Sequence, residues 1–102
     1  MQVVVGKSLT GEFVVGKLEE KDGKPILTEV YNIIFHEDRN NQMRPMIIPM
    51  MAPFDNKAVK EVSVDNFVLT MIEAPESVQQ AYIKLTTGLD VVSSGNKIIQ
   101  WK

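Results

Sequence analysis

The segment Leu9–Phe35 constrains the fold of this chain more than any other part of its sequence. Two runs in which apolar residues alternate with polar ones flank the pair Asp22-Gly23. Asp-Gly accepts the positive φ angles of a tight two-residue turn, so the segment predicts a long, twisted β-hairpin. With this pair as the turn, Lys21 faces Lys24 and fixes the register of the two arms.

A straight register places apolar residues on both faces of the hairpin near its base. This distribution favours a strongly bent sheet or a small barrel over a flat sheet with one solvated face. Gly16 lies in the middle of the first arm and is interpreted as a simple kink, with a bulge, a sharp bend or a close backbone approach as the alternatives. The predicted pairs are Leu18 with Leu27, Val15 with Val30, Val14 with Tyr31 and Phe13 with Asn32.

Length and composition bound the classes of protein that the chain can belong to. Its 102 residues make one domain with one modest core, and the net charge of −2 disfavours a diffuse polyanion binder. The sequence contains no cysteine, which excludes disulfides and thiolate zinc sites. The N-terminus shows neither a basic leader nor a long apolar run, so we expect a cytoplasmic protein with no membrane partner.

The remaining elements follow in order along the chain. Residues 2–9 predict a first strand, and residues 62–73 predict the last long strand of the sheet. A helix is expected over 75–87, because Pro75 suits a first helical position and Gly88 a helix end. Its apolar stripe comprises Val78, Ala81, Tyr82 and Leu85. The tail 89–102 predicts a small hairpin or a loose arm with a turn at Ser94-Gly95-Asn96, and with Trp101 either packed or exposed.

The stretch 44–54 is apolar but contains Pro45, Pro49 and Pro53. Proline lacks the N–H that a sheet ladder uses, and a spacing of four places all three missing donors on one edge. We therefore predict a strand that pairs well on one side and poorly on the other. Its methionines, Met46, Met50 and Met51, suit either core packing or a subunit interface.

The polar loop after Phe35 holds the only histidine, His36, and the densest set of hydrogen-bond donors in the chain. His36 is interpreted as a solvated loop residue, with a ligand or base role as the alternative. Arg39 and Arg44 bracket two asparagines and a glutamine. They are expected to form either a soluble loop or a contact with phosphates and base edges.

Five bent strands and one C-terminal helix predict a mainly β protein with a small barrel of the SH3-like, OB-like or Sm-like kind. Gly11, Gly16, Leu18 and Asp22 have a spacing that resembles the first motif of the Sm/LSm family. The later Y-N-I-I-F-H-E-D resembles the end of that motif, and V-S-V-D-N-F-V-L resembles the second motif. More narrowly, the chain resembles divergent Sm-like proteins attributed to marine cyanophages.

This resemblance implies a strongly bent five-stranded barrel over residues 2–72 in a single Sm-like domain. It also implies a closed homo-oligomeric ring, assembled through the Met46–Phe54 strand and the Val62–Ile72 strand. Such rings bind single-stranded RNA near the pore. If the chain is of phage origin, its compartment is the host cell cytoplasm.

The resemblance carries site residues over position by position. Asp22 and Asn32 match the family's third-loop acid and amide, Tyr31 matches a base-stacking position, and Asp65 and Asn66 match the end of the second motif. The chain departs from the family at Ser63-Val64, where the family has Arg-Gly, and in a longer segment between Asp22 and Asn32.

We therefore expect a non-catalytic module that binds single-stranded RNA or DNA, without a cofactor. Tyr31 would stack on a base, unless it is a core aromatic, and Asn32 and Asn66 would contact base edges. The alternative is a structural or adaptor oligomer that contacts only protein. An enzyme is not expected, because acids such as Glu19, Glu20 and Asp38 have no partner base or metal set in the sequence. The candidate phosphate contacts are Lys21, Lys24, Arg39 and Arg44.

Overall fold

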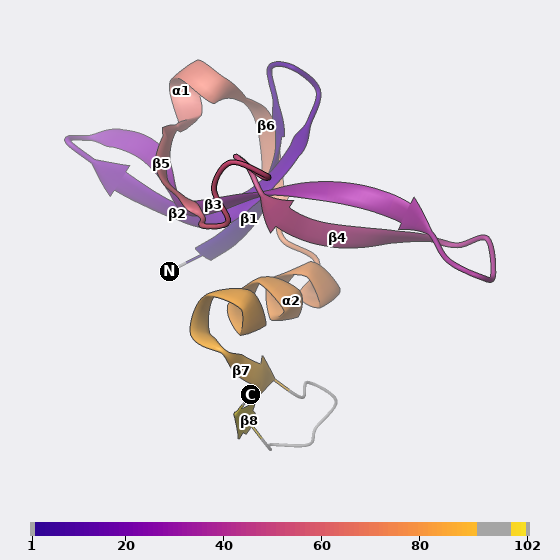
Figure 1. The fold of residues 1–102 in the computed structure, drawn as a ribbon. Helices are drawn as coiled ribbons and strands as arrows, with labels where there is room; N and C mark the ends of the chain where they lie inside the picture. The colour runs from indigo at the N-terminus through magenta and orange to yellow at the C-terminus, as the bar shows by residue number, and fades with distance from the viewer. Residues whose placement is uncertain (1, 92–98, 102) are drawn as a thin grey trace.

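The computed structural model describes residues 2–91 and 99–101, and the predicted turn at 94–96 lies outside them. The fold is mainly β, with one C-terminal helix of three turns (Figure 1). The elements are β1 (Gln2–Ser8), β2 (Phe13–Lys21), β3 (Lys24–Glu37), β4 (Met43–Pro49), β5 (Val59–Ser63), α1 (Val64–Phe67), β6 (Val68–Glu73), α2 (Glu76–Thr87), β7 (Leu89–Val91) and β8 (Ile99–Trp101).

The main sheet is antiparallel and contains six strands, in the order β4-β3-β2-β1-β6 with β5 added beside β3. The expectation of five strands was wrong because α1 divides the strand predicted at 62–73 into β5 and β6. Strand β3 is 14 residues long and has two partners on one side. Its first half pairs with β5 and its second half with β4. The tail forms a separate two-stranded sheet, β7-β8, which confirms the hairpin alternative for its backbone.

The predicted hairpin is β2-β3, and its turn is confirmed. Asp22 and Gly23 have φ angles of 54° and 79°, and Lys21 faces Lys24. The pair Leu18 with Leu27 also forms as predicted. Beyond Gly16 the straight register was wrong by one residue on β3. The pairs observed there are Val15 with Tyr31, Val14 with Asn32 and Phe13 with Ile33.

A β-bulge in β3 causes this shift of register. Glu29 and Val30 together oppose the single residue Gly16, and Glu29 has a φ of 50°. Gly16 is buried under this bulge, where an added Cβ would lie 3.1 Å from the carbonyl oxygen of Thr28. The glycine therefore marks a close backbone approach, one of the readings of its position in the sequence.

The strand expected at 62–73 is interrupted. β5 ends at Ser63, a one-turn helix follows, and β6 begins at Val68. The Ser63 hydroxyl caps the helix by accepting the backbone N–H of Asn66 at 3.4 Å, and Asp65 lies in its first turn. Ser at the cap and an acid in the first turn are favourable helix-start signals, and they outweigh the β-branched residues around them.

The proline-rich strand β4 is shorter than the predicted 44–54, because it ends at Pro49. Pro45 opposes Phe35 and Pro49 opposes Tyr31 in the ladder with β3. Since proline has no N–H, both residues turn their missing donor towards the outer edge. Among the described residues β4 pairs only with β3, so the predicted one-sided pairing is confirmed for this strand.

Helix α2 ends at Thr87 as predicted and begins at Glu76, one residue later than predicted, because Pro75 is its N-cap. Gly88 has a φ of 78° and donates its N–H to the Lys84 carbonyl at 2.8 Å. Only part of the predicted stripe is covered. Val78 and Tyr82 are buried against the sheet, whereas Ala81 and Leu85 are exposed.

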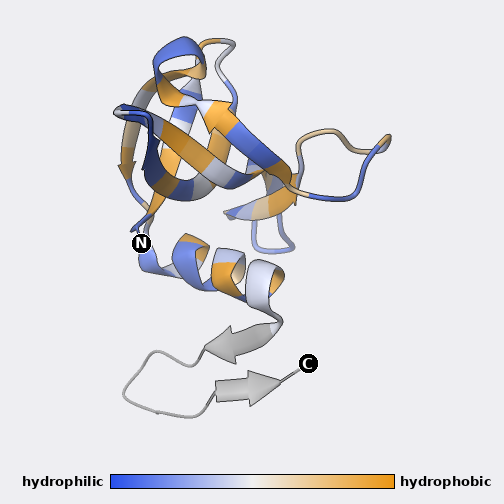
Figure 2. Ribbon diagram, turned by 90° about the vertical axis from the view of Figure 1, so that its left-hand side faces the viewer, coloured by the Kyte–Doolittle hydropathy of each residue, from blue (hydrophilic) through white to orange (hydrophobic). Residues whose placement is uncertain are grey.

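Two apolar clusters lie on opposite faces of the sheet. In Figures 1 and 2, α2 lies on one side of the sheet and α1 on the other. One cluster lies between the sheet and α2 and contains Val3, Val15, Tyr31, Ile33, Ala74, Val78 and Tyr82. The other is built from β1, β2, β3, β5, α1 and β6 around Val4, Val14, Leu27 and Val30. The sheet curls around this second cluster without closing, since the described β5 and β6 join through α1 and do not pair.

Neither helix in the described part of the chain has the length and hydropathy needed to cross a membrane.

Candidate nucleic-acid interface

The predicted site residues are distributed along the length of β3 and do not form one cluster. Lys21, Asp22 and Lys24 lie at the turn where β3 begins. Tyr31 and Asn32 lie at its middle, where β5 gives way to β4. Arg39 and Arg44 lie beyond its other end, in the loop to β4 and at the start of that strand. The last predicted residue, Asn66, lies in α1.

The structure brings Asn66 to the turn end of β3. Ser63 of β5 opposes Ile26, and β5 runs antiparallel to β3, so α1 leaves the ladder on the side of Asp22-Gly23. Lys21 reaches from the turn to β5 and pairs with Glu61, at 3.2 Å between Nζ and Oε1. Lys24, Asp22, Asp65 and Asn66 are exposed around this end. We call the four predicted residues Lys21, Asp22, Lys24 and Asn66 the turn-end group.

Tyr31 occupies the core, which was the alternative reading of this residue. Its side chain is 9% exposed, and its ring packs edge-to-face on Tyr82 with centroids 6.1 Å apart. The pKa of the Tyr31 hydroxyl is raised, mainly by burial and to a smaller extent by the negative charge of Glu29. A base that stacked on this ring would have to displace α2, so the stacking role remains a prediction for which the geometry offers no open face.

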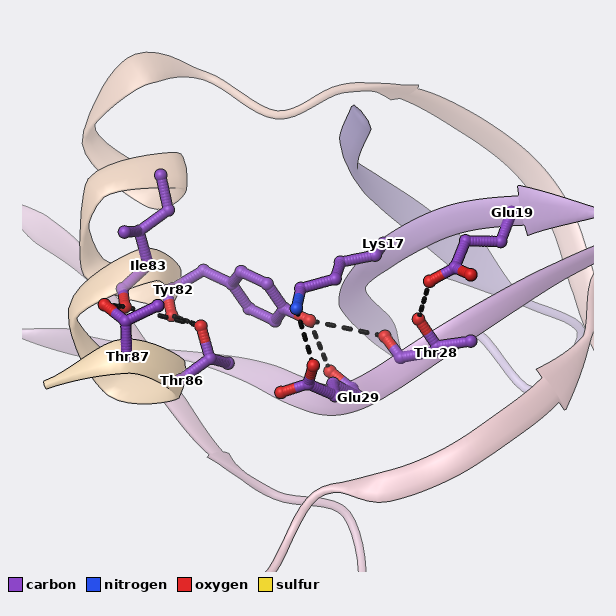
Figure 3. A network of polar contacts seen from close by, with 8 residues as sticks. All are labelled: Lys17, Glu19, Thr28, Glu29, Tyr82, Ile83, Thr86 and Thr87. Carbon is purple, nitrogen blue, oxygen red and sulfur yellow. Dashed lines mark hydrogen bonds and ion pairs between the residues drawn. The ribbon is translucent and has the colours of Figure 1, made fainter. Parts of the chain in front are cut away.

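Tyr82 explains how the β3 bulge is held in place (Figure 3). Its side chain is fully buried, and its hydroxyl donates to the carbonyl oxygen of Glu29 at 2.7 Å, with the carbonyl oxygen of Thr28 at 3.3 Å. Bulges leave backbone groups without ladder partners, and here a helix side chain supplies the donor. Burial, followed by the charge of Glu29, raises the pKa of Tyr82 far above its ordinary value.

Ionic contacts add to this junction. The Lys17 ammonium pairs with the Glu29 carboxylate, and the Thr28 hydroxyl donates to Glu19 at 2.6 Å (Figure 3). Glu19 was read as a solvated turn charge, and the structure places it instead in an exposed hydrogen bond across the hairpin. These contacts join β2 to β3, and the Tyr82 hydroxyl joins β3 to α2, so the centre of β3 is structural.

Asn32 lies beside the buried tyrosine on the opposite face of β3. Its backbone pairs with Val14 and Ile48, and its Oδ1 is buried with no hydrogen-bond partner among the described residues. An unpaired buried acceptor is unusual in a folded protein. The Asn32 side chain thus places an acceptor without a hydrogen-bond donor on the face of the sheet that carries the second cluster.

The arginine loop is organised by Asp38. This carboxylate accepts the Arg44 Nε–H at 2.7 Å and the backbone N–H groups of Asn40 at 2.8 Å and Gln42 at 3.0 Å. The Arg44 hydrogen bond, with help from Gln42 and Asn40, lowers the pKa of Asp38 to about 2. Asp38 was read as a solvated turn charge and is in fact the centre of this loop. Its pairing with Arg44 offsets half of the loop's positive charge.

Sequence reasoning did not single out the aromatic residues that the structure leaves exposed. Phe13 and Phe35 pack edge-to-face with centroids 5.9 Å apart and are 38% and 49% exposed. The Lys7 ammonium lies 5.7 Å from the Phe13 ring. Phe54, in the loop between β4 and β5, is 90% exposed. Apolar alternation predicts buried strand faces, and no signal in the sequence marks these rings as uncovered.

The described residues contain no group of three or more His, Asp or Glu side chains arranged to hold a metal ion. His36 is exposed and opposes Arg44 in the β3-β4 ladder. Comparison with models of known protein families, and with curated proteins, finds no match to this chain.

Proposed function

We propose that this chain is a non-catalytic nucleic-acid-binding module that assembles as an Sm-like homo-oligomeric ring on single-stranded RNA or DNA. The observation that carries the proposal is the convergence of the turn-end group. Lys21, Asp22 and Lys24 lie at the β2-β3 turn, and the ladder of β5 with β3 directs α1, which carries Asn66, towards the same end of the sheet. Lysine neutralises phosphates, and the amide reads base edges.

The strand order supports the barrel within this proposal. β6 pairs with β1, β5 pairs with β3, and a single helical turn joins β5 to β6. Both strands supply side chains to the interior cluster with Val4 and Leu27. A five-stranded barrel of the SH3 type formed by β1, β2, β3, β5 and β6 has this connectivity, and β4 is then an addition to it. In the proposed ring, the segment 46–54 of one subunit would meet the segment 62–72 of its neighbour.

The local charge around the turn supports an electrostatic contact in a chain that is acidic overall. Lys24 is exposed and has no ion pair among the described residues, whereas Lys21 is held by Glu61. Lys24 is therefore the stronger candidate for a phosphate contact, and Lys21 positions the turn against β5.

Fluorescence anisotropy with labelled oligouridine and oligoadenine, measured at two salt concentrations, tests the proposal. Binding should weaken as salt rises, and Lys24→Ala should lower the slope of log K against log salt by about one. Asn66→Ala should cost roughly 1–3 kcal/mol for the preferred base. Lys60→Ala, an exposed lysine outside the group, is the control and should change neither value. Absence of binding at low salt would contradict the proposal.

Arg39→Ala asks whether the arginine loop takes part. Arg39 is exposed at the far end of β3 from the turn. If this variant lowers the salt slope as much as Lys24→Ala, the bound strand extends along the whole of β3.

A structural or adaptor oligomer that contacts only protein is the second candidate function. It is favoured by the net charge of −2 and by the apolar groove lined by Phe13, Phe35 and Pro45. Anisotropy separates the two candidates, because only the first requires an oligonucleotide to bind.

A further inference from the structure

An apolar groove lies between α2 and the outer part of the sheet. It has a volume of about 280 Å³ and is lined by Phe13, Ile33, Phe35, Pro45, Ile72 and Val78. A cavity of roughly 150 Å³ lined by apolar side chains holds a benzene ring, so this groove has room for one aromatic side chain. Phe13, Phe35 and Ile72 are exposed at its rim by 38%, 49% and 62%.

The same chain presents an apolar group with no cover. Phe54 is 90% exposed, and Met51 beside it is 54% exposed. The loop that carries them is ordered by backbone hydrogen bonds, from Phe54 N–H to the Met51 carbonyl at 2.8 Å and from Asp55 N–H to the same carbonyl at 3.1 Å. In Figure 2 the segment between β4 and β5 projects from the body of the sheet. Phe54 is therefore held outward by its turn.

We propose that Phe54 of one copy inserts into the apolar groove of a second copy. An aromatic anchor in a desolvated pocket is the usual centre of a protein interface. Charge agrees with this arrangement, because Asp55 follows Phe54 directly and the Lys7 ammonium lies over Phe13 at the groove. The occupant is thus defined by its chemistry as one aromatic ring followed by one acid.

The outer edge of β4 explains why side chains, and not a shared sheet, make this contact. Pro45 and Pro49 remove two N–H groups from that edge, and Ile47 is the donor that remains between them. An edge with so few donors is a poor template for strand addition. The predicted subunit contact through 46–54 then depends on the loop at the end of β4.

The contact is head-to-tail because its two surfaces, the Phe54 loop and the apolar groove, are different. The Phe54 loop and the groove lie at separate places on one copy, so each contact joins unlike patches in a head-to-tail manner. Such contacts close into rings or continue as filaments. Phe54 alone buries roughly 150–250 Å², and a specific interface needs roughly 800 Å² per partner. Met51, Ile72 and Leu85, all about half exposed or more, must also be covered.

This inference deepens the proposed ring and rests on that part of the proposed function. The test is the mass in solution, by light scattering, of the native chain and of two variants. Phe54→Asp removes the anchor, and Ile72→Asp places a charge at the groove rim. Each should reduce the native oligomer to the 11.5 kDa monomer. Leu9→Asp is the matched control, because Leu9 is as exposed as Ile72, at 62%, and lies outside the groove.

Mixing the two variants gives the sharpest result. The Ile72→Asp copy keeps its Phe54, and the Phe54→Asp copy keeps its groove, so the mixture should form a one-to-one dimer and stop there. Circular dichroism checks that each variant is folded. If Phe54→Asp is unfolded, Phe54→Ala serves as a second variant that removes the anchor.

Three results would overturn the inference. They are a native chain that is monomeric, an oligomer that survives Phe54→Asp, and a mixture of variants that stays monomeric. The second and third leave the proposed nucleic-acid binding intact, because that is measured separately by anisotropy at the turn end. If Ile72→Asp abolishes oligonucleotide binding and Phe54→Asp does not, the groove holds a base and the inference is also overturned.

Discussion

Tyr82 is the residue on which the join between helix and sheet depends most. It is fully buried, and its hydroxyl is the donor for the bulge carbonyl of Glu29. Replacing Tyr82 with phenylalanine keeps the ring and leaves that carbonyl without a donor. We expect a loss of about 1–3 kcal/mol in the free energy of unfolding, measured by urea denaturation.

Tyr31→Phe is the control for this substitution. The two rings touch, but no hydrogen bond of the Tyr31 hydroxyl occurs among the described residues. Its removal should change the unfolding free energy little. Equal losses in the two variants would contradict the role assigned to Tyr82.

Gly16 is the second residue on which the bulge depends. A methyl group there would lie 3.1 Å from the Thr28 carbonyl oxygen, 3.3 Å from the Leu27 Cβ and 3.3 Å from the Val30 Cγ2. Two of these atoms belong to the backbone or sit next to it, and they move little. Gly16→Ala should therefore destabilise the fold by about 1–3 kcal/mol in urea denaturation. Glu20→Ala, exposed on the same strand, should stay near the native value.

Asp38 makes the arginine loop sensitive to acid. Its pKa in the folded chain is about 2, below the ordinary value of 3.8, so its contribution to stability is complete above pH 3.8. That contribution is lost as the pH falls from 3.8 through 2, because the unfolded chain takes up the proton first.

Arg44→Met should raise the pKa of Asp38 towards 3.8, because the Arg44 hydrogen bond is the largest cause of the shift. NMR titration of the carboxyl carbon measures this change. Arg39→Met is the control, since among the described residues no hydrogen bond or ion pair joins the Arg39 side chain to Asp38. A pKa of Asp38 that stays near 2 in Arg44→Met would show that the backbone donors alone hold it.

At the scale of elements, the sequence predicts what is encoded locally. Asp22-Gly23 sets the turn of β2-β3, and Pro75 and Gly88 set the ends of α2, because these residues act on their own backbone. The bulge at Glu29 was not predictable in the same way. Its donor is Tyr82, 53 residues further along the chain.

The break in the last strand had a local signal that the apolar pattern obscured. Ser63 and Asp65 are helix-start residues, but the valines and Phe67 around them favour a strand. Likewise, the core position of Tyr31 was an open alternative, since alternation does not tell which face α2 covers. The residues of the candidate site were named from the sequence, and the pairing of β5 with β3 showed which of them lie at the turn end of β3.

The prolines of β4 make a prediction at the element scale. Replacing both Pro45 and Pro49 with threonine restores N–H groups to the outer edge and creates a template for strand pairing. We expect this double variant to form larger aggregates at concentrations where the native chain stays clear, as seen by light scattering. Pro25→Thr is the control, because Pro25 lies at the turn end of β3, away from β4. Identical scattering by all three chains would contradict the role of these prolines.

At the scale of the whole molecule, the two apolar clusters stabilise the fold, and apolar side chains outside them are available for assembly. The cluster enclosed by β1, β2, β3, β5, α1 and β6 supports the curled sheet, and the cluster under α2 fixes the helix. Neither cluster covers Phe13, Phe35 or Phe54, which leaves these rings for contact with other molecules. The proposed oligomer covers these aromatic side chains, and it leaves the turn-end group open for a nucleic acid.

Sedimentation velocity with labelled oligouridine, followed at the wavelength of the label, tests the proposed function most directly. The proposal predicts that the label sediments with the protein, in a complex whose protein mass is a multiple of 11.5 kDa. Label that sediments as free oligonucleotide beside a protein of 11.5 kDa would contradict it.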